Sequence, residues 1–272
     1  MSTFILQKTQ SPLINSGNEY FWFLQEEAAA LLKEAEYQQF LYPSGFSYEF
    51  KPLSMDQLRI ASKEFCSDPE NIPVGSVEFV NNFLEQAGHL PMKPVNIPKQ
   101  LQAAKLVRRK IKRRIRKDEV LNTYKEWNCN ELFVKSASRV KGIIAEFFTE
   151  REAQYLSDGV NDYYFVSEVV GFESEFRVFV DQGEILDVRQ YAGPLAVPDY
   201  QYIKDCVQAI SKSIPSYTLD VGCLEHGRTD IVEVHPFVSC GLYGFSHPRI
   251  LGMTKSAWKW VFEKTEPVVL DE

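Results

Sequence analysis

Residues 164–191 read YFVSEVVGFESEFRVFVDQGEILDVRQY, and this stretch decides the fold. Its apolar residues recur at every second position, which predicts a strand, a short polar loop and a β-hairpin. Asp181-Gln182-Gly183 supplies the turn, and a three-residue loop ending in glycine predicts a type I turn followed by a left-handed residue. In that register one set of side chains shares the core face: Phe176, Val178, Val180, Leu186 and Val188.

The other face of this predicted hairpin carries charge. Its members are Glu175, Arg177, Phe179, Ile185, Asp187 and Arg189. Two arginines and two carboxylates are unfavourable to bury unless they meet water or a charged ligand. One explanation is two cross-strand ion pairs, Arg177 with Asp187 and Glu175 with Arg189. Each would contribute roughly 0.2–1 kcal/mol. The other explanation is a charged ligand.

A second hairpin is predicted over residues 217–235, YTLDVGCLEHGRTDIVEVH. With a turn centred on His226-Gly227, Asp220 lies directly opposite Glu233. Like charges opposed on a β-ladder are destabilising, and a divalent cation between two carboxylates reverses that effect. A three-residue loop would instead place Asp220 and Glu233 on opposite faces. An arginine-rich hairpin followed by an acidic one indicates a site for a metal–polyphosphate ligand.

Over roughly residues 132–245 these hairpins resemble the ATP-grasp superfamily of ATP-dependent carboxylate–amine ligases. More narrowly they resemble a clade of small ATP-grasp proteins that is common in phage and bacterial genomes. The resemblance implies an α+β ATP-grasp fold, in which two α+β lobes grip ATP, preceded by a small α/β domain. We expect that N-terminal domain over residues 1–98 and the ATP-grasp domain over residues 99–272.

The resemblance also implies a phosphate-binding segment within ELFVKSASRVKG, residues 131–142. Lys135, at the end of a short predicted strand, matches the lysine that contacts the α- and β-phosphates. Ser138 and Lys141 match the flexible loop that folds over the phosphate chain. This loop has one glycine where the superfamily has several, so fewer backbone N–H groups would face phosphate.

Adenosine recognition is implied for the segment between the two hairpin strands. Glu168 matches the acid that accepts from the adenine amino group, and the backbone of Val169 and Val170 would complete adenine recognition. Glu175, seven positions after Glu168, matches the acid that binds the ribose hydroxyls. One carboxylate can accept two hydrogen bonds from a ribose diol.

Phosphoryl transfer is implied for the charged faces of both hairpins. Arg177 and Arg189 would face the transferring phosphate, because the planar fork of arginine suits that geometry. Asp220 and Glu233 match the first two ligands of the superfamily's magnesium site, and His235 stands where asparagine is usual. Imidazole is a poor magnesium ligand. His235 is therefore not a ligand, or binds substrate, or the site tolerates Mn²⁺.

The segment KLVRRKIKRRIRK, residues 105–117, is the most basic of the chain. Its apolar residues fit a helix with a narrow apolar stripe, which indicates a solvated helix. Two functional alternatives stay open. The helix could bind RNA or DNA phosphates, or one cation among Arg109, Lys110 and Lys112 could contact the phosphates of ATP.

Composition agrees with a globular protein of one or two domains. The 272 residues have a net charge of −7, which argues against a general nucleic-acid binder. The five cysteines lack paired spacing, so we expect a reducing cytoplasm and neither disulfides nor a zinc site. We expect neither a membrane span nor a signal peptide.

Four further elements are predicted from local patterns. They are a strand at Phe4–Leu6, a helix at Glu26–Glu36, a helix capped by Ser76 and ended by Gly88, and a helix at Ser256–Glu263.

The predicted activity is an ATP-dependent ligase that forms an amide or peptide bond through an acyl phosphate. Its partners would be ATP with Mg²⁺, a carboxylate and an amine, each a small molecule or a peptide. A kinase-type phosphotransferase of the same superfamily is the first alternative. A ligase linked to nucleic acid through residues 105–117 is the second.

Overall fold

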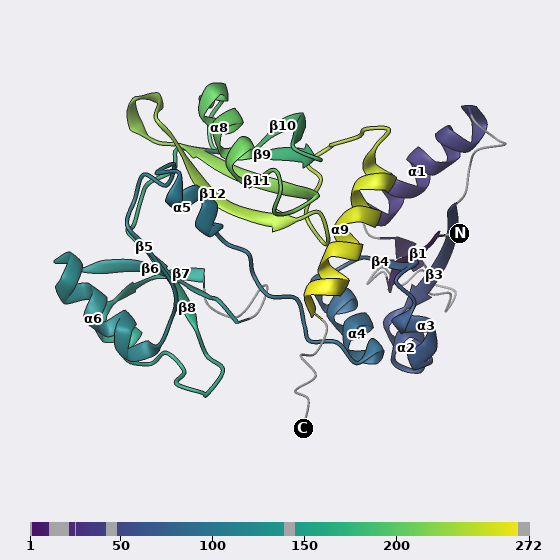
Figure 1. Cartoon of the computed structure of the whole chain (residues 1–272), viewed down its shortest axis with the longest axis horizontal. Helices are drawn as coiled ribbons and strands as arrows, with labels where there is room; N and C mark the ends of the chain where they lie inside the picture. The colour runs from purple at the N-terminus through teal and green to yellow at the C-terminus, as the bar shows by residue number, and fades with distance from the viewer. Residues whose placement is uncertain (1, 11–21, 25, 42–47, 139–144, 266–272) are drawn as a thin grey trace, which may run out of the picture. The chain divides into compact units, whose positions relative to one another are not determined.

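The structure is a computed structural model, and it describes residues 2–10, 22–24, 26–41, 48–138 and 145–265. By their packing the residues divide into two compact units (Figure 1). The first comprises residues 1–91, 212–218 and 236–272, and the second comprises residues 92–211 and 219–235. The C-terminal segment thus packs with the N-terminal one, whereas the boundary expected after residue 98 remains a proposal about domains.

The first unit is built around a mixed sheet. Strand β1 (Ser2–Gln10) pairs antiparallel with β2 (Trp22–Leu24) and parallel with both β3 (Tyr48–Ser54) and β4 (Asn71–Val74). Its helices are α1 (Glu26–Leu41), α2 (Met55–Arg59), α3 (Lys63–Ser67), α4 (Val77–Ala87) and α9 (Ile250–Thr265). The strand and the three helices predicted in this unit are confirmed, and only α4 has the predicted limits.

Helix α4 shows why those limits were predictable. The Ser76 hydroxyl accepts from the Phe79 N–H at 3.2 Å, which satisfies one donor of the first turn. Gly88 ends the helix with φ +85°, a conformation that glycine adopts readily. The apolar face of α4 is buried, so periodicity and both caps act together.

The second unit holds two four-stranded sheets, ordered β5-β8-β6-β7 and β10-β9-β11-β12. The strands are β5 (Ile111–Ile115), β6 (Glu131–Ser136), β7 (Ala145–Thr149), β8 (Tyr164–Ser167), β9 (Ser174–Asp181), β10 (Glu184–Ala192), β11 (Ser216–Cys223) and β12 (Thr229–Pro236). The helices are α5 (Lys99–Ala103), α6 (Lys117–Trp127), α7 (Glu150–Ala153) and α8 (Tyr200–Ile210). Helix α6 packs Val120 and Tyr124 onto the first sheet, and α8 lies along the second (Figure 1).

The hairpin at residues 164–191 forms, but its turn differs from the prediction. The loop is two residues long, because Asp181 pairs with Glu184. Gln182 and Gly183 have φ of 50° and 80°, the pattern of a type I′ turn that matches the twist of its strands. Ile185 consequently lies opposite Val180 on the core side, and an irregularity at Leu186 restores the predicted register, so that Arg189 lies opposite Arg177. The placement of Ile185 on the charged face was therefore wrong.

The turn of the second hairpin also differs. Residues Glu225–Gly227 form one 3₁₀ turn, which the Leu224 N–H closes by donating to the Arg228 carbonyl at 2.7 Å. The predicted two-residue turn on His226-Gly227 was therefore wrong. The carboxylates of Asp220 and Glu233 are nevertheless close, because the charge of Glu233 contributes to the raised pKa of Asp220.

The predicted basic helix over residues 105–117 does not form, since β5 occupies most of that segment. Ile111 and Ile115 are buried, and a spacing of four residues fits one face of a strand as well as one face of a helix. The cations around them contact the protein itself. Arg113 donates to the Ile97 carbonyl at 2.9 Å, and the Arg114 guanidinium lies 4.8 Å from the centre of the Tyr163 ring.

Two negative expectations can be compared with the described residues. All five cysteines are free thiols, as the absence of paired spacing predicted. In the part of the chain that is described, no helix combines the length and apolar character that crossing a bilayer requires.

Gly193, directly after β10, gives a first testable prediction. Its φ is +79°, and an added Cβ would lie 1.9 Å from the Glu173 carbonyl oxygen. Gly193→Ala is expected to lower the free energy of unfolding by roughly 2–4 kcal/mol, because it combines left-handed strain with a backbone clash. Gly252→Ala, in α9 with no atom within 4 Å of the added Cβ, is the matched control. Chemical denaturation should show stability unchanged or raised for that control, and equal stability of both variants would contradict the clash.

Candidate functional site

A cavity of about 170 Å³ lies within the second unit, beside the ends of several strands. Five residues predicted for the site line it: Lys135, Glu168, Val170, Glu175 and Glu233. The remaining lining residues are Asn96, Arg109, Phe133, Phe147, Phe165, Ser167, Phe172 and Val232. Phenyl and valine side chains thus form the walls, and charged groups lie around them. Such a cavity suits a flat heterocycle with polar substituents.

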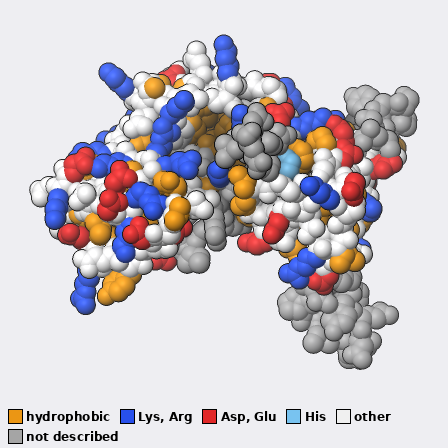
Figure 2. Space-filling view, turned by 60° about the horizontal axis from the view of Figure 1, so that its bottom comes forward, with side chains coloured by type: hydrophobic (Ala, Val, Ile, Leu, Met, Phe, Trp, Pro, Cys, Tyr) orange, Lys and Arg blue, Asp and Glu red, His pale blue; other side chains and the backbone are white. Residues whose placement is uncertain are grey.

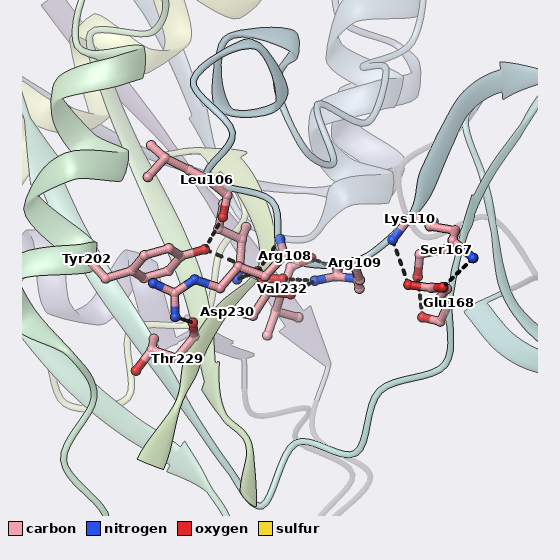
Figure 3. A network of polar contacts seen from close by, with 11 residues as sticks. Leu106, Arg108, Arg109, Lys110, Ser167, Glu168, Tyr202, Thr229, Asp230 and Val232 are labelled. Atoms are coloured by element: carbon pink, nitrogen blue, oxygen red, sulfur yellow. Dashed lines mark hydrogen bonds and ion pairs between the residues drawn. The ribbon is translucent and has the colours of Figure 1, made fainter. Parts of the chain in front are cut away.

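Glu168 is held by the segment that precedes β5 (Figure 3). Its carboxylate accepts from the Lys110 backbone N–H at 2.8 Å and lies 3.2 Å from the Lys110 ammonium. In return the Glu168 N–H donates to the Lys110 carbonyl at 3.0 Å. These contacts fix the end of β8 against residue 110 and orient the Glu168 carboxylate at the edge of the cavity.

Glu175 and Arg177 share a neighbour that the sequence pattern did not single out. The Tyr191 hydroxyl, on β10, donates to Glu175 Oε2 at 2.5 Å. The same ring lies 5.7 Å from the Arg177 guanidinium, within cation–π range. Burial raises the pKa of Tyr191, and the charges of Asp220 and Glu175 act in the same direction, so the hydroxyl stays a donor.

Arg177 and Asp220 form a two-bond ion pair between β9 and β11. Arg177 Nε and Nη2 donate to the two Asp220 oxygens at 2.9 and 2.6 Å. Their side chains are only 9% and 3% exposed. Burial raises the pKa of Asp220 although the guanidinium opposes that shift. Arg177 therefore compensates an acid that burial alone would destabilise.

The ion pairs expected along the first hairpin are distributed differently. Arg189 binds Asp187, on its own strand, at 2.7 Å. Glu175 accepts from Tyr191, so the expected pair between Glu175 and Arg189 does not form. The strand β11, which the prediction ignored, supplies the acid for Arg177. The charged face is therefore linked across three strands instead of two.

Lys135 and Glu233 bring the two sheets of the second unit together. The Lys135 ammonium on β6 donates to Glu233 Oε2 on β12. Burial acts to raise the pKa of Glu233, but the charges of protonated His235, Lys135 and Arg177 hold it below its usual range. His235 Nε2 lies 3.4 Å from Glu233 Oε1. Glu233 is thus an ionised carboxylate surrounded by cations.

Two of the predicted metal ligands fit a magnesium ion. Mg²⁺ prefers oxygen ligands and is commonly held by one or two carboxylates together with phosphate oxygens. The mutual repulsion of Asp220 and Glu233, seen in the raised pKa of Asp220, is the electrostatic term that a cation offsets. The described residues contain no group of three or more His, Cys, Asp or Glu side chains placed to share a metal. His235 as a third ligand therefore gains no support.

Four predicted site residues do not line this cavity. Val169 is exposed, and the Arg189 side chain remains 43% exposed. The Ser138 hydroxyl donates to the Asn161 carbonyl at 2.6 Å. Lys141 lies outside the described residues. Their roles in a phosphate-binding loop and in phosphoryl transfer remain predictions.

Arg109 joins the site from the basic segment (Figure 3). Its Nη1 binds Asp230 at 3.0 Å, and the side chain is 5% exposed. The same Asp230 accepts from the Tyr202 hydroxyl at 3.1 Å, and Arg108 packs on the Tyr202 ring at 4.3 Å. Consecutive residues therefore anchor to β12 and to β8. Sequence reasoning named Arg109 among three candidates but placed it on a helix.

The surface gives no single basic patch on the face shown in Figure 2. Blue lysine and arginine side chains are interspersed there with red acidic ones. The arginines of residues 105–117 mostly bind carbonyls, Asp230 or aromatic rings. A continuous phosphate-binding helix, on which the nucleic-acid alternative depended, is absent from the described part of this segment.

Comparison with solved structures shows a shared fold. The RimK domain ATP-grasp protein of Sphaerobacter thermophilus has a TM-score of 0.53 and 10% identity, with 97% of this chain and 98% of that chain covered. D-alanine–D-alanine ligase of Bacillus anthracis has a TM-score of 0.52 and 13% identity, covering 96% and 98%. N5-carboxyaminoimidazole synthetase of Staphylococcus aureus, complexed with ADP, has a TM-score of 0.50 and 11% identity, covering 87% and 74%.

The predicted α+β ATP-grasp fold is therefore confirmed, while such low identities show nothing beyond the fold. No curated protein matches the chain in sequence. A family model for an ATP-grasp domain, the second family of its clade, matches residues 111–253, more than half of the chain. The chain therefore belongs to this family of ATP-grasp domain proteins.

Proposed function

We propose that this protein is an ATP-dependent carboxylate–amine ligase that forms an amide or peptide bond through an acyl phosphate. The observation that carries the proposal is the convergence of Lys135, Glu168, Glu175 and Glu233 on one cavity. These residues come from β6, from the segment between β8 and β9, and from β9 and β12, so their convergence is a property of the fold. Membership of the ATP-grasp family supports the same conclusion.

The adenosine part of ATP would occupy the apolar portion of the cavity. Phe165, Phe172 and Val232 offer faces on which a purine can pack. Glu168, oriented by Lys110, would accept from the adenine amino group. Glu175 would accept from the ribose hydroxyls, and its bond to Tyr191 holds one carboxylate oxygen in place.

The phosphates would lie toward the cationic groups. Lys135 would exchange its bond to Glu233 for phosphate oxygens, and Arg177 would face the transferring group while remaining paired with Asp220. Cations fixed before the reaction stabilise developing negative charge without reorganisation. A magnesium or manganese ion held by Asp220 and Glu233, when bound, would neutralise further phosphate charge.

The chemistry requires no protein nucleophile. A substrate carboxylate attacks the γ-phosphorus, and ADP leaves, which gives an acyl phosphate. An amine then attacks the acyl carbon, phosphate leaves, and the nitrogen loses a proton, which gives the amide. The protein would bind, orient and neutralise charge, and the cationic and acidic side chains around the cavity suit those tasks.

Trapping the acyl phosphate tests this reaction. The protein would be incubated with ATP, Mg²⁺ and pooled carboxylates and amines, and hydroxylamine would be added in place of the amines in a parallel sample. We expect ADP, phosphate and a hydroxamate, identified by mass spectrometry, and an amide when the amines are present. A stable phosphate ester instead of a hydroxamate would show a kinase-type phosphotransferase.

Lys135→Ala gives a prediction about affinity. Loss of a charge-assisted hydrogen bond is expected to raise the dissociation constant for ATP about 10- to 100-fold. Lys112→Ala is the matched control, because Lys112 also binds a single glutamate, Glu126, and does not line the cavity. Isothermal calorimetry should show unchanged affinity for the control, and equal affinities of both variants would remove the phosphate role of Lys135.

A further inference from the structure

Asn96 enters the cavity from a segment outside every helix and strand of the second unit. Its backbone has φ of 53° and forms an isolated antiparallel bridge with Val234 on β12. The Val234 N–H donates to the Asn96 carbonyl at 2.7 Å. This bridge holds Asn96 beside Glu233, so its side chain is fixed by backbone contacts distant in the sequence.

The side-chain oxygen of Asn96 lacks a partner. Asn96 is 6% exposed, and Oδ1 is buried without any hydrogen bond in the described residues. Buried carbonyl oxygens of this kind are normally satisfied, and each exception requires an explanation. Since Asn96 lines the same cavity as Phe172 and Val232, a ligand in that cavity is positioned to supply the missing donor.

We propose that Asn96 is a nucleotide-binding residue whose Oδ1 accepts a hydrogen bond from the adenosine moiety of ATP. The inference rests on the proposed function, because it takes ATP as the ligand. An amide oxygen carries partial negative charge, so it repels phosphate and selects an N–H or O–H donor. Adenosine offers two such donors, the amino group of the base and the ribose hydroxyls. The unsatisfied oxygen would then be satisfied only in the complex.

The left-handed backbone of Asn96 suggests the sharpest variant. Asparagine tolerates positive φ, and glycine adopts it more readily still. Asn96→Gly therefore keeps the backbone conformation and removes only the amide. Asn128→Gly is the matched control, because Asn128 has φ of 51° at the end of α6, is exposed and does not line the cavity.

The test measures MgATP affinity by isothermal calorimetry together with the unfolding midpoint. Asn96→Gly should weaken binding about tenfold while the midpoint stays within the range of the Asn128→Gly control. Affinity equal to that of wild type would overturn the proposal and leave Asn96 as a backbone device. Absence of ATP binding by the wild-type protein would overturn the proposed function itself, which separates the two failures.

Three analogues then distinguish the donor. Purine riboside triphosphate lacks the amino group, and 2′-deoxy-ATP and 3′-deoxy-ATP each lack one hydroxyl. The analogue without the relevant donor should bind wild type and Asn96→Gly equally. A tenfold difference that persists for all three would contradict an adenosine donor.

Discussion

Glutamine in place of Glu233 is expected to reduce divalent-cation-dependent ATP turnover at least about 100-fold. The substitution keeps the shape of the side chain but removes its charge. Glu233 is held ionised by Lys135, Arg177 and protonated His235, so its charge is what the neutral amide cannot replace. The loss should appear in phosphate release measured against Mg²⁺ concentration, with a higher half-saturating concentration.

The control for Glu233→Gln is Glu126→Gln. Glu126 also binds a lysine, Lys112, but its side chain is 58% exposed and lies outside the cavity. Both variants should unfold at denaturant concentrations close to that of wild type. Full turnover by Glu233→Gln at the wild-type magnesium dependence would remove Glu233 from the cation site.

Arg177 is expected to affect catalysis more than ATP affinity. Arg177→Lys keeps a positive charge but loses the two-bond fork to Asp220, so kcat should fall about 100-fold or more while the dissociation constant for ATP changes less than about threefold. Arg177→Ala leaves Asp220 buried and unpaired, and should in addition lower the free energy of unfolding by about 3–5 kcal/mol.

Arg151→Lys, on the exposed surface of α7, controls for the exchange of arginine for lysine. Turnover rates and calorimetric affinities should be measured on the same preparations. A rise in the dissociation constant with kcat unchanged would make Arg177 a binding residue. Loss of stability without either kinetic effect would make the pair with Asp220 structural only.

Local signals explain what was predictable. Helix α4 was predicted to the residue, because its cap, its apolar period and its terminal glycine all lie within the same short segment. The strands of both hairpins were also predicted from alternation. Their turns were not, since a two-residue loop at Gln182-Gly183 and a three-residue loop fit the same flanking pattern, and only the pairing of Asp181 with Glu184 distinguishes them.

The basic segment shows the opposite situation. Strand β5 was taken for a helix because the spacing of Ile111 and Ile115 fits both periods. The decisive facts are long-range: Asp230 lies far along the chain and compensates Arg109, which makes its burial possible. No pattern within residues 105–117 contains that information.

The candidate site was predictable only where motifs carried it. Lys135, Glu168, Glu175 and Glu233 were named from spacing, and they line one cavity. The apolar walls come from separate strands and loops, so single phenylalanines carried no signal. Asn96 likewise carried none, because its significance depends on a bridge to Val234.

Photolabelling with 2-azido-ATP tests most directly whether this cavity binds the nucleotide. After irradiation in the presence of Mg²⁺, digestion and mass spectrometry would locate the modified residues. We predict saturable labelling of peptides that contain Phe165–Phe172 or Val232–Glu233, suppressed by excess ATP and weakened in Lys135→Ala. Saturable, ATP-suppressed labelling confined to other segments would contradict the assignment of this cavity to ATP.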